Sequence, residues 1–170
     1  MKKPLVIAHR GASGYRPENT LEAFQLGLAQ GADGIEFDLV TTKDEELIIR
    51  HENALSGTTD VATQSVFSAR KRIGLVDDAQ RFDWYSEDFE LAEIKALRAK
   101  ERLPESRSGS AKFDGQFEIP TLNELLAQDF LRDKVVVCEI KEGSHLAKLS
   151  PSIEELLAQK IELSKPISNL

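Results

Sequence analysis

The feature that most constrains this chain is a set of short apolar segments. One of them ends at a histidine, and the others contain carboxylates. Leu5–Ala8 stops at a histidine, Ile35–Val40 contains two carboxylates, and Val135–Ile140 is apolar except for one glutamate. The last of these is the near-continuous type of strand that parallel sheets bury on both faces. Helical patterns lie between the runs, and this alternation predicts an α/β fold with a largely parallel sheet.

The first predicted helix begins near Thr20, with Asn19 or Thr20 as its N-cap, and it ends at Gly31. A further strand is expected at Glu46–Arg50. The connection that precedes it, residues 41–45, is too short to hold a crossover helix. The two strands that it joins therefore pair as a hairpin or return by another helix-free path, and the sequence leaves both open.

Residues 55–117 differ in character from the rest because they are mostly polar. They include one helical stretch at 91–97, and their end, Arg102–Gly115, is rich in serine, glycine and charge, which predicts a flexible surface loop. We interpret 55–117 as an insertion within a single domain that covers 1–170. Three aromatic residues are expected to pack within it rather than to line a pocket: Trp84, Tyr85 and Phe89.

Two more helices are predicted after this segment. Thr121 and Glu124 form a capping-box pattern for a helix that continues to about Phe130. Ser150–Pro151 opens a last amphipathic helix. Its apolar side carries four residues: Ile153, Leu156, Leu157 and Ile161.

Composition is that of a globular domain, with 170 residues, 41% hydrophobic and 30% charged. The net charge of −7 argues against a general attraction to nucleic acid or to an anionic membrane. Cys138 is the only cysteine, so no intrachain disulfide forms, and we expect it in the core. The apolar run at 4–8 is too short for a signal-peptide core, which predicts a cytoplasmic protein, although an exported form without its leader stays open.

Three carboxylates interrupt the predicted strands. Glu36 and Asp38 are two residues apart, so their side chains share one face, where they repel each other unless a cation compensates. Glu139 lies in an apolar run, with Lys141 on the same face. The alternatives are ordinary acids on an exposed edge strand and a structural Glu139–Lys141 ion pair. Three carboxylates without a cluster of Cys or His favour Mg²⁺, Mn²⁺ or Ca²⁺ over zinc.

Two histidines and an arginine accompany these acids. His9 and His51 each follow an apolar run, and histidine suits general acid–base catalysis, although either one can be a core residue. Arg10 offers a planar donor fork for phosphate oxygens, with a surface salt bridge as the alternative. Glu18 is equally plausible as an acid favoured at a helix N-terminus. His145 lies in a polar stretch, and no role is assigned to it.

These motifs, in their order along the chain, resemble the glycerophosphodiester phosphodiesterase family, within the phospholipase-C-like phosphodiesterase superfamily. The resemblance rests on five motifs: His9-Arg10-Gly11, Glu18-Asn19-Thr20, Glu36-x-Asp38, His51 and Glu139-x-Lys141. It implies a distorted TIM barrel with a small insertion. It also implies that glycerophosphodiesters, such as glycerophosphocholine, are hydrolysed to glycerol 3-phosphate and an alcohol. A divalent cation would be held by three residues: Glu36, Asp38 and Glu139.

The resemblance also implies roles for the remaining residues. Arg10 and Lys141 would neutralise charge on the phosphate, and Glu18 would add a contact with substrate or metal. One of His9 and His51 would accept a proton from the nucleophile, and the other would protonate the departing alkoxide. The sequence does not assign the two roles. It also leaves open whether water attacks directly or a glycerol hydroxyl attacks first to give a cyclic phosphate.

Two other functions stay open, and the length of the chain bears on one of them. A lysophospholipid could replace the glycerophosphodiester, which would require an apolar channel beside the site. A TIM barrel takes about 250 residues, and we find only four barrel strands, near Leu5, Ile35, Leu47 and Val135. We therefore expect the N-terminal half of a barrel, incomplete at its C-terminus and at most weakly active or a binding module. Self-association through its open edge would follow.

Overall fold

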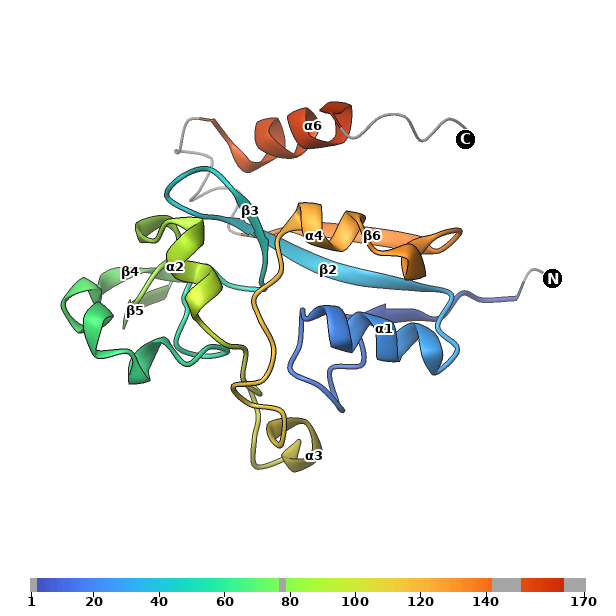
Figure 1. Ribbon diagram of the computed structural model, residues 1–170, viewed down its shortest axis with the longest axis horizontal. Coiled ribbons are helices and arrows are strands. Elements are labelled where there is room, and N and C mark those ends of the chain that lie inside the picture. The colour runs from blue at the N-terminus through green and yellow to red at the C-terminus, as the bar shows by residue number, and fades with distance from the viewer. Residues whose placement is uncertain (1–2, 77–78, 142–150, 164–170) are drawn as a thin grey trace.

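A four-stranded sheet forms the centre of the computed structural model, which describes residues 3–76, 79–141 and 151–163 (Figure 1). Its strands are β1 (Ile7–His9), β2 (Gly34–Thr41), β3 (Leu47–Ile49) and β6 (Val135–Ile140). β2 pairs with all three others, in parallel with β1 and β6 and antiparallel with β3. Every residue of β2 is buried. The predicted α/β fold with a largely parallel sheet is confirmed.

The β3 strand corrects one part of the prediction. Leu39 is paired with Ile49 of β3 and with Ile140 of β6, so β3 and β6 lie on opposite edges of β2. Because β3 runs antiparallel, the strand near Leu47 is the second arm of a hairpin and not a parallel barrel strand. The open choice between a hairpin and another return is thereby settled in favour of the hairpin, as the short connection at 42–46 requires.

Helix α1 (Leu21–Ala29) returns the chain from β1 to β2. The Thr20 hydroxyl caps it by accepting a hydrogen bond from the Ala23 amide at 3.2 Å. Asn19 is therefore not the cap, and its side chain points elsewhere. Gly31 follows the helix with φ of +98°, the left-handed conformation in which glycine commonly ends helices, as predicted.

Helix α4 (Leu122–Leu126) precedes β6 and has the predicted capping box. The Glu124 amide donates to Thr121 Oγ1 at 3.1 Å, and the Thr121 amide donates to the Glu124 carboxylate at 2.8 Å. The helix is shorter than predicted because Gln128 adopts an extended conformation, and Phe130 lies in a separate 3₁₀ turn, η4 (Asp129–Leu131). The capping box therefore fixes where α4 begins but not where it ends.

Replacing Thr121 with alanine should lower the free energy of unfolding by about 1 kcal/mol, because the amide of residue 124 loses its acceptor at a buried helix terminus. Urea denaturation measures this loss. Thr121→Ser keeps the hydroxyl and should retain most of the stability. Equal losses in the two variants would show that the Thr121 methyl group, and not the cap, is responsible.

The last helix, α6 (Ile153–Leu163), packs on β2 and β3. Ile153 and Leu156 are buried, as the amphipathic pattern predicts, whereas Ile161 is 49% exposed. The helix begins at Ile153, with Ser152 and Glu155 exchanging capping hydrogen bonds. No helix within the described residues is both long and apolar enough to cross a membrane.

The described residues of 55–117 form short elements, most of which lie beside the β3 end of the sheet (Figure 1). These elements are η1 (Val61–Thr63), η2 (Ser65–Arg70), β4 (Arg72–Val76), β5 (Ala79–Asp83), η3 (Ser86–Asp88), α2 (Leu91–Ala96) and α3 (Ser108–Ala111). The helix at 91–97 is confirmed, whereas the β4–β5 hairpin was not predicted. Trp84, Tyr85 and Phe89 are buried, as expected for packing. Apolar residues of this segment and of the sheet share one core cluster. That residues 55–117 are an insertion stays a prediction.

Strand β6 is more exposed than its apolar sequence predicts. Val135, Val136 and Val137 are 39–42% exposed, and Cys138 is exposed rather than in the core. The reason is that β6 pairs only with β2 among the residues that the structure describes, so its other edge has no strand to cover it. The expected self-association through this edge stays a prediction.

Candidate functional site

The last residue of β1, His9, and the first residue after it, Arg10, lie beside Glu36 in the first half of β2. His9 is paired with Glu36 across the two parallel strands, and His9 Nε2 lies 3.8 Å from Glu36 Oε2, with 66% of the histidine side chain exposed. Arg10 adopts a φ of +57°, and its amide donates to the Glu36 carbonyl and carboxylate. Gly11 has a φ of +79°, and a Cβ there would lie 2.5 Å from the Ala23 carbonyl carbon. Only glycine fits this close approach of the turn to α1.

Glu36, Asp38 and Glu139 lie together, as their positions on the strands led us to expect. Asp38 and Glu139 are directly paired between β2 and β6, and the three residues each offer an oxygen within 4.8 Å of the others. The Asp38 side chain is fully buried, that of Glu36 is 12% exposed, and that of Glu139 is half exposed. The alternative of ordinary acids on an exposed edge strand is wrong for Glu36 and Asp38, because β2 is central.

The oxygen atoms of this cluster fit a hard divalent cation. Glu36 Oε1 and Asp38 Oδ1 are buried and have no hydrogen-bond partner among the described residues. Burial and the neighbouring Asp38 charge both raise the pKa of Glu36. A buried carboxylate oxygen without a donor is costly, and a cation would compensate both oxygens at once. Three carboxylates form the kind of oxygen ligand set that suits Mg²⁺, Mn²⁺ or Ca²⁺.

Lys141 links two members of the cluster. Its ammonium donates to Glu139 Oε1 at 2.5 Å and lies 3.4 Å from Asp38 Oδ1. Burial lowers the pKa of Lys141, but the two carboxylates outweigh this effect and raise it, while Lys141 lowers the pKa of Glu139. The Glu139–Lys141 ion pair that the sequence offered as an alternative to a metal site is therefore present. It lies beside two carboxylate oxygens that accept no hydrogen bond from the described residues.

Asp38 is also held from the side of α1. The Asn19 amide donates to Asp38 Oδ2 at 2.9 Å, and Arg10 Nε lies 3.2 Å from the same oxygen. Asn19 reaches the sheet because it adopts a left-handed conformation with φ of +58°. Interpreting Asn19 as only a helix cap is thus wrong, since Thr20 caps the helix and Asn19 orients a buried carboxylate.

Glu18 lies between two guanidinium groups. It accepts from Arg10 at 3.2 Å and from Arg102 at 2.8 and 3.1 Å, and its side chain is 5% exposed. Burial raises the pKa of Glu18, but its bonds and charge interactions with Arg102 and Arg10 outweigh this and lower it. Glu18 is therefore not a free acid at a helix N-terminus. It is also not one of the three clustered carboxylates, and a contact with substrate or metal stays a prediction.

His51 lies just beyond β3, with 18% of its side chain exposed. Its Nδ1 atom is buried, makes no hydrogen bond to the described residues and lies 3.4 Å from Glu52 Oε1. His51 and Glu18 both line a cavity of about 10 Å³, which is room for one water molecule. Arg10 makes ion pairs with Glu18 and Asp38 in a largely buried position, and not the surface salt bridge considered as an alternative. His145 lies outside the described residues.

Sequence analysis missed Arg102 and Glu52. Arg102 Nη1 donates to Glu52 Oε1 at 2.6 Å, although the two residues are 50 positions apart. Adjacency to His51 could have drawn attention to Glu52. Arg102 gave no local signal, since it opens the Ser- and Gly-rich stretch that we expected to be a flexible loop. In the structure that stretch contains α3, and Arg102 contacts the site.

Glu52 should dominate the acid sensitivity of this region. Burial would raise its pKa, but contacts with His51 and Arg102 hold it at about 2, below the ordinary value of 4.5. This contribution to stability is complete above pH 4.5 and is lost as the pH falls toward 2. It amounts to on the order of 3 kcal/mol. Denaturation of wild type and Glu52→Gln across pH 5 to 2 should show a shallower decline in the variant. Parallel curves would contradict this assignment.

Comparison with known proteins identifies the family. The model of the glycerophosphoryl diester phosphodiesterase family matches residues 9–159. A glycerophosphodiester phosphodiesterase of Caldanaerobacter subterraneus is 37% identical over 160 residues, which are 94% of this chain and 53% of that protein. One of Arabidopsis thaliana is 38% identical over 125 residues, 74% of this chain and 33% of its own length. The chain thus spans about half or less of these relatives.

Solved structures agree with these matches. A phosphodiesterase of Oleispira antarctica, in complex with the product sn-glycerol-3-phosphate, aligns with a TM-score of 0.61 and 28% identity over 94% of this chain and 51% of that one. A putative glycerophosphoryl diester phosphodiesterase of Silicibacter pomeroyi aligns with a TM-score of 0.63 and 26% identity, over 94% and 53%. The fold is that of a TIM-barrel sheet, of which the chain matches about half. The chain belongs to the glycerophosphoryl diester phosphodiesterase family.

Proposed function

We propose that this chain hydrolyses glycerophosphodiesters to glycerol 3-phosphate and an alcohol. The observation that carries the proposal is a pair of buried oxygens, on Glu36 and Asp38, that accept no hydrogen bond from the described residues. They lie next to Glu139 and beside two cationic side chains, in a member of this family. The product that the Oleispira antarctica structure contains is the one proposed here. Because the chain spans about half of its relatives, the activity of those relatives supports the proposal without establishing it.

Glu36, Asp38 and Glu139 would hold a divalent cation, which when bound polarises the phosphoryl oxygens. Arg10 and Lys141 already lie beside Asp38, so their donors can turn to phosphate oxygens and offset the negative charge of the transition state. Their present bonds to carboxylates keep both cations at the site and orient them before a substrate binds.

We assign proton transfer to the two histidines, His9 and His51. The nucleophile, a water or a glycerol hydroxyl, gives its proton to one of them as its oxygen bonds to phosphorus; a glycerol hydroxyl gives a cyclic phosphate, which a water molecule then opens to glycerol 3-phosphate. The bond from phosphorus to the alcohol oxygen breaks, and the other histidine gives that oxygen a proton. His51 turns Nδ1 toward Glu52, which leaves Nε2 for this exchange, and His9 is accessible beside Glu36.

An assay of the purified chain on glycerophosphocholine tests the proposal, with Mg²⁺, Mn²⁺ or Ca²⁺ added and glycerol 3-phosphate detected. We expect metal-dependent release of glycerol 3-phosphate. Asp129→Asn is a suitable control, because Asp129 is an exposed acid outside the cluster. A folded chain that releases no product with any of the three cations would refute the proposed activity.

The same purified chain can be used to test the two alternatives, a binding module and a lysophospholipid-cleaving enzyme. If the chain is only a binding module, calorimetry should show sn-glycerol 3-phosphate binding without turnover, and size-exclusion chromatography should show association through the β6 edge. Lysophosphatidylcholine serves as a second substrate. Faster turnover of lysophosphatidylcholine than of glycerophosphocholine would favour the lysophospholipid alternative.

A further inference from the structure

One arginine joins the two carboxylates that flank the proposed catalytic groups. Arg102 uses all three of its guanidinium nitrogens: Nε and Nη2 donate to Glu18 at 3.1 and 2.8 Å, and Nη1 donates to Glu52 at 2.6 Å. The Glu18 and Glu52 side chains are 5% and 9% exposed. A planar fork that bridges two buried carboxylates fixes both of them in position.

Each of these carboxylates contacts a group with a proposed role. Glu52 Oε1 lies 3.4 Å from His51 Nδ1, a buried nitrogen that has no hydrogen-bond partner within the described part of the chain. Glu18 accepts from Arg10 on its other side. A buried ring N–H needs an acceptor, and Glu52 is the acceptor at hand. Hydrogen bonds of this kind are often long before a substrate binds.

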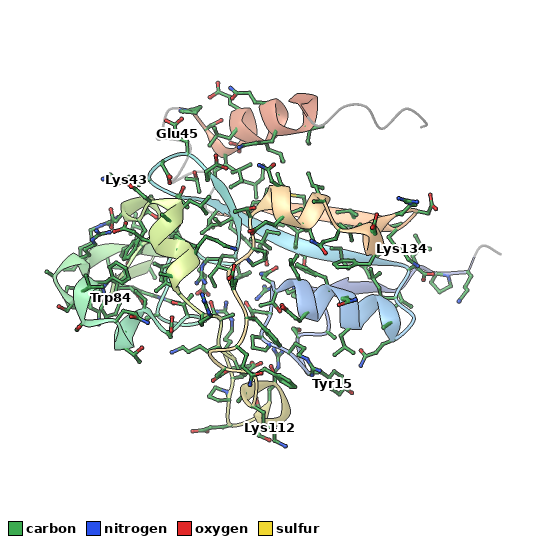
Figure 2. All side chains as sticks on the ribbon, in the orientation of Figure 1. Tyr15, Lys43, Glu45, Trp84, Lys112 and Lys134 are labelled. Carbon is green, nitrogen blue, oxygen red and sulfur yellow. The ribbon has the colours of Figure 1, made fainter. Side chains whose placement is uncertain are left out.

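The segment that carries Arg102 is itself attached to the loop at 10–18. Arg107 donates to the Ser13 carbonyl at 3.2 Å, and the Arg16 guanidinium lies 3.7 Å from the centre of the Phe113 ring. Figure 2 labels one residue of each segment, Tyr15 and Lys112, both in the lower part of the view. Arg102 is therefore one of several contacts that hold this segment against the site.

We propose that Arg102 is a positioning residue that acts through Glu52 to fix the ring of His51, with Glu18 as its second anchor. The inference rests on the proposed function, since it gives His51 a catalytic role. With Nδ1–H directed at Glu52, Nε2 is left unprotonated and faces the site as the proton acceptor. A purely structural ion pair would change stability but would not change the tautomer of His51.

Nitrogen NMR of the imidazole rings provides a test that does not depend on turnover. The chain has three histidines, so the ¹⁵N-labelled protein gives three sets of ring signals, and His51→Asn identifies the set of His51. We expect the Nδ1–H tautomer in wild type and a mixture in Glu52→Gln and Arg102→Lys. Lysine keeps the charge but cannot engage both carboxylates at once. Arg98→Lys is the control, because Arg98 donates to the carbonyls of its own segment.

Kinetics add a second measurement. Arg102→Lys and Glu52→Gln should each lower kcat by about 10²-fold with little change in KM, the effect of a misplaced catalytic group. The kcat of the double variant should be no lower than that of the less active single variant. Unchanged His51 nitrogen signals in either single variant would overturn the inference, and Arg102→Gln replaces Arg102→Lys if the lysine variant does not fold. A wild-type chain without turnover would refute the proposed function and leave the NMR result to stand.

Discussion

Removing divalent cations with a chelator is expected to abolish turnover, and returning Mg²⁺, Mn²⁺ or Ca²⁺ is expected to restore it. Glu36 and Asp38 share one face of a buried strand, and each has an oxygen that accepts no hydrogen bond from the described residues. Their mutual repulsion is relieved only partly by Arg10 and Lys141. A cation that binds the folded chain alone should also stabilise it, by about 2.7 kcal/mol at one hundred times its dissociation constant.

Thermal denaturation with and without each cation measures that stabilisation, and the assay on glycerophosphocholine measures turnover. Glu139→Gln is the most informative variant, because Glu139 is half exposed and its replacement should weaken cation binding while the fold is retained. Asp129→Asn is the matched control on an exposed acid. Full activity after exhaustive chelation would eliminate the metal site, whatever the stability data show.

Alanine at His51 or at His9 should each lower the rate by about 10²–10⁴-fold, the usual range for a general acid or base. His9 is 66% exposed, so its loss should leave stability nearly unchanged. His51 is largely buried, so its variant needs a folding check by circular dichroism. The rate constants for glycerophosphocholine, measured with saturating cation, give the comparison.

His145→Ala provides the control, since the sequence assigns that histidine no role. Turnover close to wild type in His51→Ala or His9→Ala would make the replaced histidine structural. The same conclusion would follow for His51 if its variant did not fold. A large loss in His145→Ala as well would show that the assay responds to something other than the proposed acid and base.

Local sequence determined much of this fold. The carboxylates Glu36 and Asp38 share a face because strand side chains alternate with a period of two, and that rule needs no tertiary information. Thr121 and Glu124 form their capping box because the two residues are three positions apart. The parallel sheet followed from apolar runs separated by helical patterns. The first two of these features depend on neighbours within a few residues.

Tertiary structure alone decided how the site is held. Arg102 meets Glu18 across 84 positions and Glu52 across 50, and no pattern in a single sequence marks a pairing of that length. The exposure of β6 likewise depends on which strands flank it and not on its own apolar residues. Spacing and periodicity thus predicted which side chains share the face of β2. The contacts that fix Asp38, Glu18 and Glu52 in place arise only when distant segments fold together.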